Sequence, residues 1–188
     1  MHRKPLLDVL AAYVARHPED ADRVTRFRQF VEAHADCFER SCRTGHVTGS
    51  AWILSPERGR VLLTHHRKLG RWLQLGGHAD GDPDPYRVAL REAREESGLV
   101  DLTPFEHAEP PLPLDVDVHR IPARAAEPAH FHFDVRYLLL AGAEALRPTD
   151  ESVALAWFDR AQLAETIREE SILRMEHRTR LLLAGPSA

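Results

Sequence analysis

The sequence predicts an α/β fold: a layered α/β/α sandwich around a mixed, curved sheet, with a helical extension at the N-terminus. Apolar residues recur at helical spacing over about the first 40 residues, and the period changes to that of strands from His46 onward. A charge-dense helix then separates the early strands from the late ones, and a last helix follows. We therefore divide the chain into a helical extension, 1–45, and one domain, 46–188.

Composition limits what the chain can do. A length of 188 residues suits one domain with a small appendage, and 43% hydrophobic residues suffice for a core. The net charge of −4 gives no basic footprint for nucleic acid, and no apolar run approaches the roughly 20 residues of a membrane span. The N-terminus does not resemble a signal peptide. With two cysteines, Cys37 and Cys42, we expect reduced thiols and a cytoplasmic setting.

The N-terminal extension contains two amphipathic patterns. Residues 5–16 carry apolar side chains at helical spacing, Pro18 interrupts the pattern, and a second helix is predicted over 19–40. We expect these helices to pack on the domain or to form a homodimer contact.

Strand patterns follow the extension. Residues 46–55 and 60–66 flank the turn sequence SPERG and predict a hairpin. A short strand over 72–77 ends at two glycines, and 103–114, with its prolines, is expected to be a loop. Further strands are predicted at 114–119, 130–142 and 153–158, with a final helix or pair of helices over 160–183.

The stretch Gly76–Leu99, GGHADGDPDPYRVALREAREESGL, holds the charge-dense helix. Asp82 or Asp84 is its expected N-cap, a proline lies in its first turn, and Gly98 is expected to cap its C-terminus. These signals predict a helix that begins just after the acidic loop.

Three glutamates, Glu92, Glu95 and Glu96, share an arc of roughly 100° on this helix. Like charges at this spacing cost roughly 0.2–0.5 kcal/mol per pair, and a divalent cation with oxygen ligands would offset that cost. The alternative is an exposed acidic face on which Arg91 reaches Glu95 at i,i+4.

The same stretch resembles the Nudix box, G-x5-E-x7-R-E-U-x-E-E-x-G-U, where U is aliphatic. Gly77 opens the pattern, and the whole C-terminal half is in register, from Arg91 to Leu99. Pro83 replaces the first glutamate of the pattern, with Asp82 and Asp84 on either side. The resemblance covers about 46–170. It implies a Nudix hydrolase that cleaves the diphosphate linkage of a nucleoside diphosphate joined to another moiety.

The resemblance also implies roles for individual residues. Glu92, Glu95 and Glu96 would bind Mg²⁺ or Mn²⁺ together with the carbonyl of Gly76 or Gly77. Catalysis would rest on Glu95 and Glu96, with Arg91 orienting a carboxylate. Glu151 is the candidate for one more acidic residue, as a metal ligand or as the base for water. Metal ions suit this chemistry because a bare acidic helix would repel an anionic diphosphate.

A second constellation alternates along two strands. His130, His132 and Asp134 alternate with apolar residues, as do Asp115, Asp117 and His119. Symmetric closure of the hairpin by 120–129 predicts the cross-strand pairs His119–His130, Asp117–His132 and Asp115–Asp134. A solvated face is one interpretation. The other is a functional surface, as a substrate-binding wall, as acid/base groups or as a second metal site.

Basic and aromatic residues surround the approach to the glycines. The candidates for substrate binding are His66, Lys68, Arg71, Trp72 and His78. Lys68 and Arg71 could neutralise a phosphate, and Trp72 could stack on a base or belong to the core. His78 could be a ligand, a phosphate contact or an ordinary loop histidine.

Two other functions compete with hydrolysis. Isopentenyl-diphosphate isomerases share the Nudix architecture, and the histidines near the glycines resemble theirs. Those enzymes need a cysteine near the position of Leu75, and no cysteine follows Cys42. A nucleotide sensor without turnover is the second alternative, since Pro83 leaves the box incomplete.

Overall fold

The computed structural model describes residues 2–67, 69–106, 108–123, 128–147 and 152–185. The helices are α1 (Lys4–Arg16), the 3-10 turn η1 (Pro18–Asp20), α2 (Ala21–Ala33), α3 (Pro85–Ser97), α4 (Leu163–Thr166) and α5 (Glu170–Ala184). The strands are β1 (Gly45–Leu54), β2 (Arg60–His66), β3 (Arg71–Leu73), β4 (Leu75–His78), β5 (Leu102–Pro104), β6 (Asp115–Ile121), β7 (His130–Ala141) and β8 (Ser152–Asp159).

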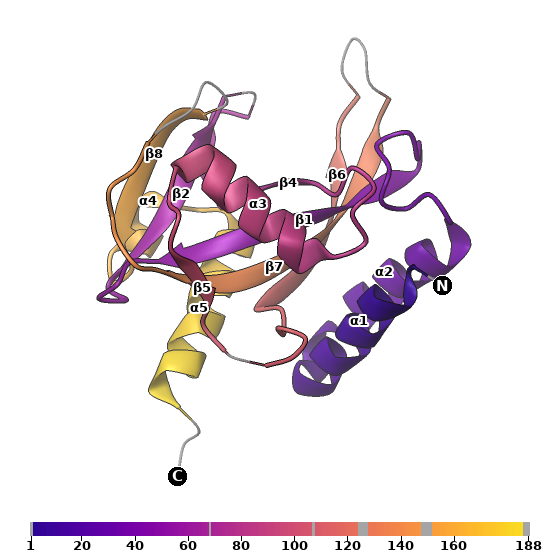
Figure 1. Cartoon of the computed structure of the whole chain (residues 1–188), viewed down its shortest axis with the longest axis horizontal. Helices are drawn as coiled ribbons and strands as arrows, with labels where there is room; N and C mark the ends of the chain where they lie inside the picture. The colour runs from indigo at the N-terminus through magenta and orange to yellow at the C-terminus, as the bar shows by residue number, and fades with distance from the viewer. Residues whose placement is uncertain (1, 68, 107, 124–127, 148–151, 186–188) are drawn as a thin grey trace.

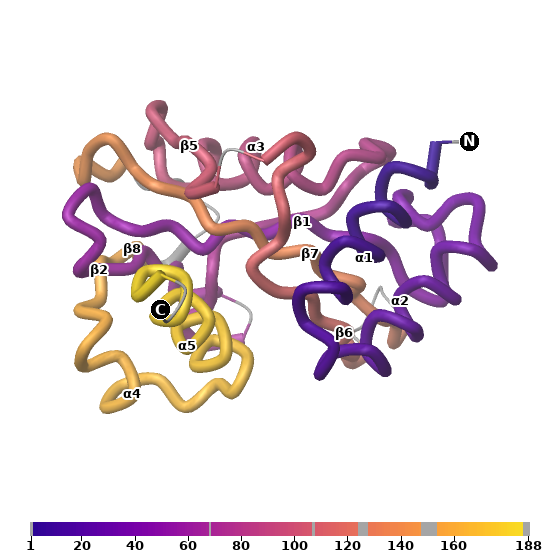
Figure 2. Tube along the Cα trace, turned by 90° about the horizontal axis from the view of Figure 1, so that it is seen from below, coloured from indigo at the N-terminus to yellow at the C-terminus, as the bar shows by residue number. Residues whose placement is uncertain are grey.

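The elements form the predicted α/β/α layers. Helix α3 lies on one face of the sheet, and α4 and α5 lie on the other, as Figure 2 shows. Figure 1 shows α1 and α2 packed side by side beyond one end of α3. The expectation of a layered sandwich is confirmed.

Strand β1 is the centre of the eight-stranded sheet. One edge of β1 runs parallel to β7 along its whole length. Its other edge pairs antiparallel with β4 in the first half and with β2 in the second. In the same way β7 pairs with β6 in one half and β5 in the other. The sheet is therefore mixed, as predicted, and both β1 and β7 change their antiparallel partner partway along their length.

Several elements differ from the sequence prediction. The hairpin of β1 and β2 is confirmed, with Ile53 opposite Leu62. The predicted strand over 72–77 is broken at Gln74, because β3 pairs with β2 whereas β4 pairs with β1. The second helix ends at Ala33 instead of continuing to 40, since the backbone at His34 is extended.

The register of β6 and β7 corrects another expectation. Asp117 lies opposite Asp134 and His119 opposite His132, two residues away from the predicted pairs. The hairpin continues to Ile121, opposite His130, so the connection is shorter than expected. A shift of two residues preserves the face of every side chain. The six His and Asp residues therefore do share one face.

The N-terminal helices belong to the core on the α3 side. Phe30 stacks on Phe133 of β7 with ring centroids 3.8 Å apart, and Phe27 lies 5.3 Å from the same ring. The expected packing on the domain is confirmed. A homodimer contact and the division of the chain at residue 45 stay predictions.

The opposite face of the sheet has a second core, where Trp52 and Leu138 pack with Ile172 and Met175 of α5. Cys37 and Cys42 are buried free thiols. Among the helices in the described ranges, none combines the length and the apolar character needed to cross a membrane.

Candidate active site

Local signals fix the start and the end of α3. The side chain of Asp84 accepts hydrogen bonds from the amides of Tyr86 (3.0 Å) and Arg87 (3.3 Å), and Pro85 begins the helix. Gly98 ends it in the left-handed region, with φ 71°. Of the two expected N-caps, Asp84 is the one used.

Pro83 lies in the loop before this cap. Its neighbour Asp82 accepts a hydrogen bond from the Asp84 amide at 3.0 Å and lies 3.6 Å from the Arg87 guanidinium. Both aspartates that flank Pro83 therefore shape the loop and the helix start. These contacts of the two aspartates lie within the loop and the first turn of α3, and none of them involves Glu92, Glu95 or Glu96.

Two glycines let α3 approach the sheet. A Cβ at Gly49 would lie 2.4 Å from the carbonyl oxygen of Pro85. A Cβ at Gly77 would lie 2.4 Å from a carboxylate oxygen of Glu92. The Glu92 carboxylate thus occupies the space that a side chain at Gly77 would need, which brings the acidic helix against β4.

The three glutamates of α3 differ in exposure. Glu92 and Glu96 are both only 9% exposed, whereas the Glu95 side chain is 61% exposed. Glu96 accepts a hydrogen bond from the Gly76 amide at 3.1 Å. The strand backbone therefore positions the two buried carboxylates, and Glu95 extends from the same helix toward solvent.

Arg91 links the acidic residues to β4. Its guanidinium lies 2.7 Å from Glu92 and 3.5 Å from Glu95, and it donates a hydrogen bond of 2.9 Å to the carbonyl oxygen of His78. The position agrees with the orienting role that the resemblance implies, and the role itself stays a prediction.

This donor set fits a hard divalent cation. Arg91 offsets part of the charge of the three carboxylates, and oxygen donors are the ligands that Mg²⁺ and Mn²⁺ prefer. Among the described residues, the glutamates do not converge as closely as a group of histidines does on the opposite face of the sheet. Bound water or substrate oxygens would complete such a site.

The sheet face that packs against α5 carries the second core at Leu138 of β7 and polar residues earlier along the same strand. Asp134 of β7, which is 2% exposed, lies at the middle of this polar area. Its carboxylate accepts hydrogen bonds from Thr48 and Ser50 (both 2.8 Å), Gln74 (3.3 Å) and Arg136 (2.8 Å).

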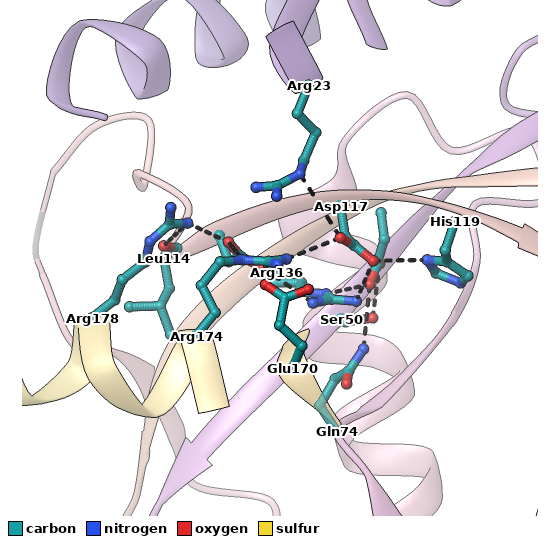
Figure 3. Close-up of polar contacts among 12 residues, drawn as sticks. Arg23, Ser50, Gln74, Leu114, Asp117, His119, Arg136, Glu170, Arg174 and Arg178 are labelled. Carbon is teal, nitrogen blue, oxygen red and sulfur yellow. Dashed lines mark hydrogen bonds and ion pairs between the residues drawn. The ribbon is translucent and has the colours of Figure 1, made fainter. Parts of the chain in front are cut away.

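Arginines of β7 and α5 complete this arrangement (Figure 3). Arg136 lies 3.1 Å from both Asp115 and Asp117. Arg174 of α5 lies 2.9 Å from the same two carboxylates, and Arg178 also binds Asp115. We call this ion cluster and its extension to the N-terminal helices the arginine–aspartate network. Its members are Asp20, Arg23, Asp115, Asp117, Asp134, Arg136, Arg174 and Arg178.

The network reaches the N-terminal helices. Arg178 also binds Asp20 and the Tyr13 hydroxyl, and Arg23 of α2 lies 2.6 Å from Asp20. Burial raises the pKa of Tyr13, so its hydroxyl stays protonated. The N-terminal extension, the sheet and α5 are therefore joined by buried polar contacts.

The network lowers the pKa of Asp117. Burial opposes ionisation, but the hydrogen bond with His119 and the charges of Arg136 and Arg174 outweigh it and hold the pKa well below its usual range. Asp117 and Asp134, both expected to contact substrate, are thus ion-paired with arginines. Substrate contact by these two residues stays a prediction.

The histidines gather at the other end of the same polar face. The ring of His46 on β1 lies 4.7–4.9 Å, between centroids, from the rings of His78, His130 and His132. The ring of His119 lies 5.4 Å from that of His132. We call these five residues the histidine cluster.

Burial is the largest cause of the lowered pKa values in this cluster. It lowers the pKa of His132 to about 2 and that of His78 to about 4, and neighbouring charges add to the effect. Both rings are therefore neutral near pH 7.

Sequence reasoning missed His46. The signal was present, because His46, Thr48 and Ser50 alternate with Val47 and Gly49 in the pattern that drew attention to β7. The register places His46 directly opposite His132.

The remaining candidates lie near the β2–β3 turn. His66 pairs with Arg71, and the Arg71 guanidinium lies 3.8 Å from Glu169. Trp72 packs edge-on against Phe158, with centroids 4.9 Å apart, at the border of the second core. This packing favours the core interpretation of Trp72. Lys68 and Glu151 lie outside the described residues.

Comparisons with known proteins agree with the resemblance of Gly77–Leu99 to the Nudix box. The NUDIX domain family matches residues 45–177. A hydrolase of the NUDIX family from Clostridium perfringens is similar in structure, with 25% identity and a TM-score of 0.59 over 73% of this chain and 97% of that one. No curated protein sequence matches the chain.

Two further solved structures support the fold alone. An Ap4A hydrolase binary complex from C. elegans has 16% identity and a TM-score of 0.58, covering 74% of this chain and 98% of that one. The NUDIX domain of Shewanella oneidensis NrtR, complexed with ADP ribose, has 18% identity and a TM-score of 0.52, covering 73% and 87%.

The chain belongs to the NUDIX family. Its fold and its box residues on α3 make it an enzyme of the Nudix hydrolase class, as the sequence predicted.

Proposed function

We propose that this enzyme hydrolyses the diphosphate linkage of a nucleoside diphosphate joined to another moiety, with Mg²⁺ or Mn²⁺ as cofactor. The observation that carries the proposal is the acidic side of α3, held against the glycines of β4 with Arg91 beside it. Ap4A and ADP ribose, named for two of the similar structures, are nucleotides with such linkages.

The chain supplies positioned oxygen donors for this chemistry. Glu92, Glu95 and Glu96, with the carbonyl of Gly77, would hold the cations, and Arg91 keeps the glutamate carboxylates oriented. When bound, such cations screen the diphosphate charge, polarise phosphoryl oxygens and lower the pKa of bound water. We assign the proton-accepting role to Glu95 or Glu96, with Glu151 as a further candidate.

A substrate panel tests the proposal. We would assay nucleoside diphosphate sugars, ADP-ribose, dinucleoside polyphosphates, CDP-alcohols and nucleoside triphosphates with and without Mg²⁺ or Mn²⁺. The wild type should turn over at least one class only with metal. Glu96→Gln should lose about 10²-fold or more of that activity, since several kcal/mol of transition-state stabilisation depend on the metal site.

Glu165→Gln is the matched control, because Glu165 is an exposed glutamate of α4. It should retain wild-type activity. Equal turnover by Glu96→Gln and the wild type would contradict the role given to Glu96.

A catalytically weak nucleotide-binding sensor is the second candidate. Pro83 favours it, because no carboxylate stands at that position of the box. Nucleotide binding in calorimetry without turnover on the whole panel would support the sensor. The isomerase is not proposed, since Leu75 is fully buried in β4 and both cysteines precede it.

A further inference from the structure

We propose that His46, His130 and His132 bind one divalent transition-metal ion of the Zn²⁺ class, at a site separate from the glutamates of α3. One ring nitrogen from each of the three residues lies within 4.8 Å of the other two. The three residues come from two neighbouring strands, β1 and β7, in fixed register.

The spacing of two ring nitrogens matches a metal site. Nε2 of His130 and Nε2 of His132 are 3.3 Å apart. Two nitrogens bound to one tetrahedral Zn²⁺ at roughly 2.0–2.1 Å are roughly 3.3–3.4 Å from each other. This separation is compatible with a shared ion, and His46 contributes the third of the converging ring nitrogens.

A hydrogen bond fixes the tautomer of His130. Its Nδ1 lies 2.9 Å from the carbonyl oxygen of Pro128. A carbonyl only accepts, so Nδ1 carries the proton and Nε2 accepts a hydrogen bond from His132 Nε2–H, a proton that a bound ion would replace. Metal-binding histidines typically donate their second ring nitrogen to a carbonyl in this way.

The chemistry of the donors selects the class of ion. Imidazole nitrogens suit Zn²⁺ and other transition metals, whereas Mg²⁺ prefers oxygen. The nearby carboxylates already have partners: Asp117 contacts arginines and His119, as Figure 3 shows, and Asp134 accepts a hydrogen bond from Arg136.

A cavity lies beside the proposed site. A cavity of about 390 Å³ borders His46 and His130 and is also lined by Arg40 and Arg43. A tetrahedral ion held by three protein ligands has a fourth position for an exchangeable group. Of the two arginines, Arg40 binds the Asp80 carboxylate, which offsets its charge.

A binding experiment tests the site without relying on hydrolysis. We would strip the full-length protein with a chelator, add excess Mg²⁺ to occupy the carboxylates, and titrate with Co²⁺ while recording its d–d absorption. Wild type should bind one ion, and Zn²⁺ should displace it. His132→Ala should weaken Co²⁺ binding at least about tenfold to a hundredfold. Far-UV circular dichroism would verify that the variant is folded.

Three variants separate this site from the alternatives. His177→Ala removes an exposed histidine of α5, and Glu96→Gln alters α3; both should bind Co²⁺ as the wild type does. His34, Asp36 and Cys42 form another group of converging ligands, so Cys42→Ser should also leave Co²⁺ binding unchanged.

Absence of Co²⁺ binding, equal binding by His132→Ala, or a thiolate charge-transfer band that Cys42→Ser removes would each overturn the proposal. The hydrolase proposal is tested by the turnover of Glu96→Gln, whereas this proposal is tested by Co²⁺ binding. Failure of one can therefore be distinguished from failure of the other.

Discussion

The histidine cluster and the arginine–aspartate network lie on one sheet face and share strands β6 and β7. Along β7 they follow one pattern, in which His130, His132, Asp134 and Arg136 occupy alternate positions. Their surroundings differ. Arginines of α5 and α2 close the aspartate end, whereas the histidine end borders a cavity.

The difference teaches which buried polar groups indicate a ligand. In the network, four carboxylates, three of them buried, pair with four guanidinium groups within the protein. In the histidine cluster, ring nitrogens of His46, His130 and His132 instead lie within 4.8 Å of one another. We therefore interpret the network as structural and the cluster as the part that binds something from outside.

The largest expected effect would follow from breaking the network at its centre. Arg136→Met should lower the free energy of unfolding by about 3–5 kcal/mol, because Asp115, Asp117 and Asp134 lose a buried partner. Urea unfolding of the variant and the wild type measures this loss.

Arg28→Met is the matched control. Arg28 forms an exposed i,i+4 pair with Glu32 at 3.5 Å, and its loss should cost less than about 1 kcal/mol. A loss at Arg136 as small as that of the control would contradict the structural interpretation of the network.

Sequence patterns sufficed for several local features of the fold and for the shared face of β6 and β7. The caps of α3 at Asp84 and Gly98 follow from residue types, and alternation placed the polar residues of β6 and β7 on one face. Strand alternation cannot fix the register, because a shift of two residues leaves the pattern unchanged.

Long-range partners could not be predicted in the same way. Arg174 lies 59 residues from Asp115 in sequence, and Arg178 lies 158 residues from Asp20. Nothing in a helical pattern states which strand an arginine will reach. The separation of the polar face into a histidine cluster and an arginine–aspartate network can therefore be seen only in the folded structure.

The next effect concerns the histidine cluster. His132→Ala should lower kcat/KM at least about tenfold on whichever substrate the wild type hydrolyses, a loss of about 1.4 kcal/mol or more. His132 lies among His46, His119 and His130, and next to His78, whose carbonyl Arg91 holds beside the acidic helix. Steady-state kinetics measures the loss.

The same variant should stay within about 1 kcal/mol of the wild type in unfolding free energy, unlike Arg136→Met. His177→Ala, on the exposed side of α5, should change neither quantity. Wild-type kinetics for His132→Ala would assign the cluster to a surface without a part in turnover.

The smallest effect is a change in acid stability at the aspartate end. The pKa of Asp117 is lower in the folded protein than in the unfolded chain, despite burial, because His119, Arg136 and Arg174 favour the charged form. Its contribution is fully present above a pH of about 4 and is lost as pH falls toward the folded value. Asp117→Asn removes this titration. Below pH ~4 its unfolding free energy should therefore fall less steeply, by up to ~1.4 kcal/mol per pH unit. Urea unfolding at a series of pH values measures both slopes, and parallel slopes would show that the arginines do not hold Asp117 ionised.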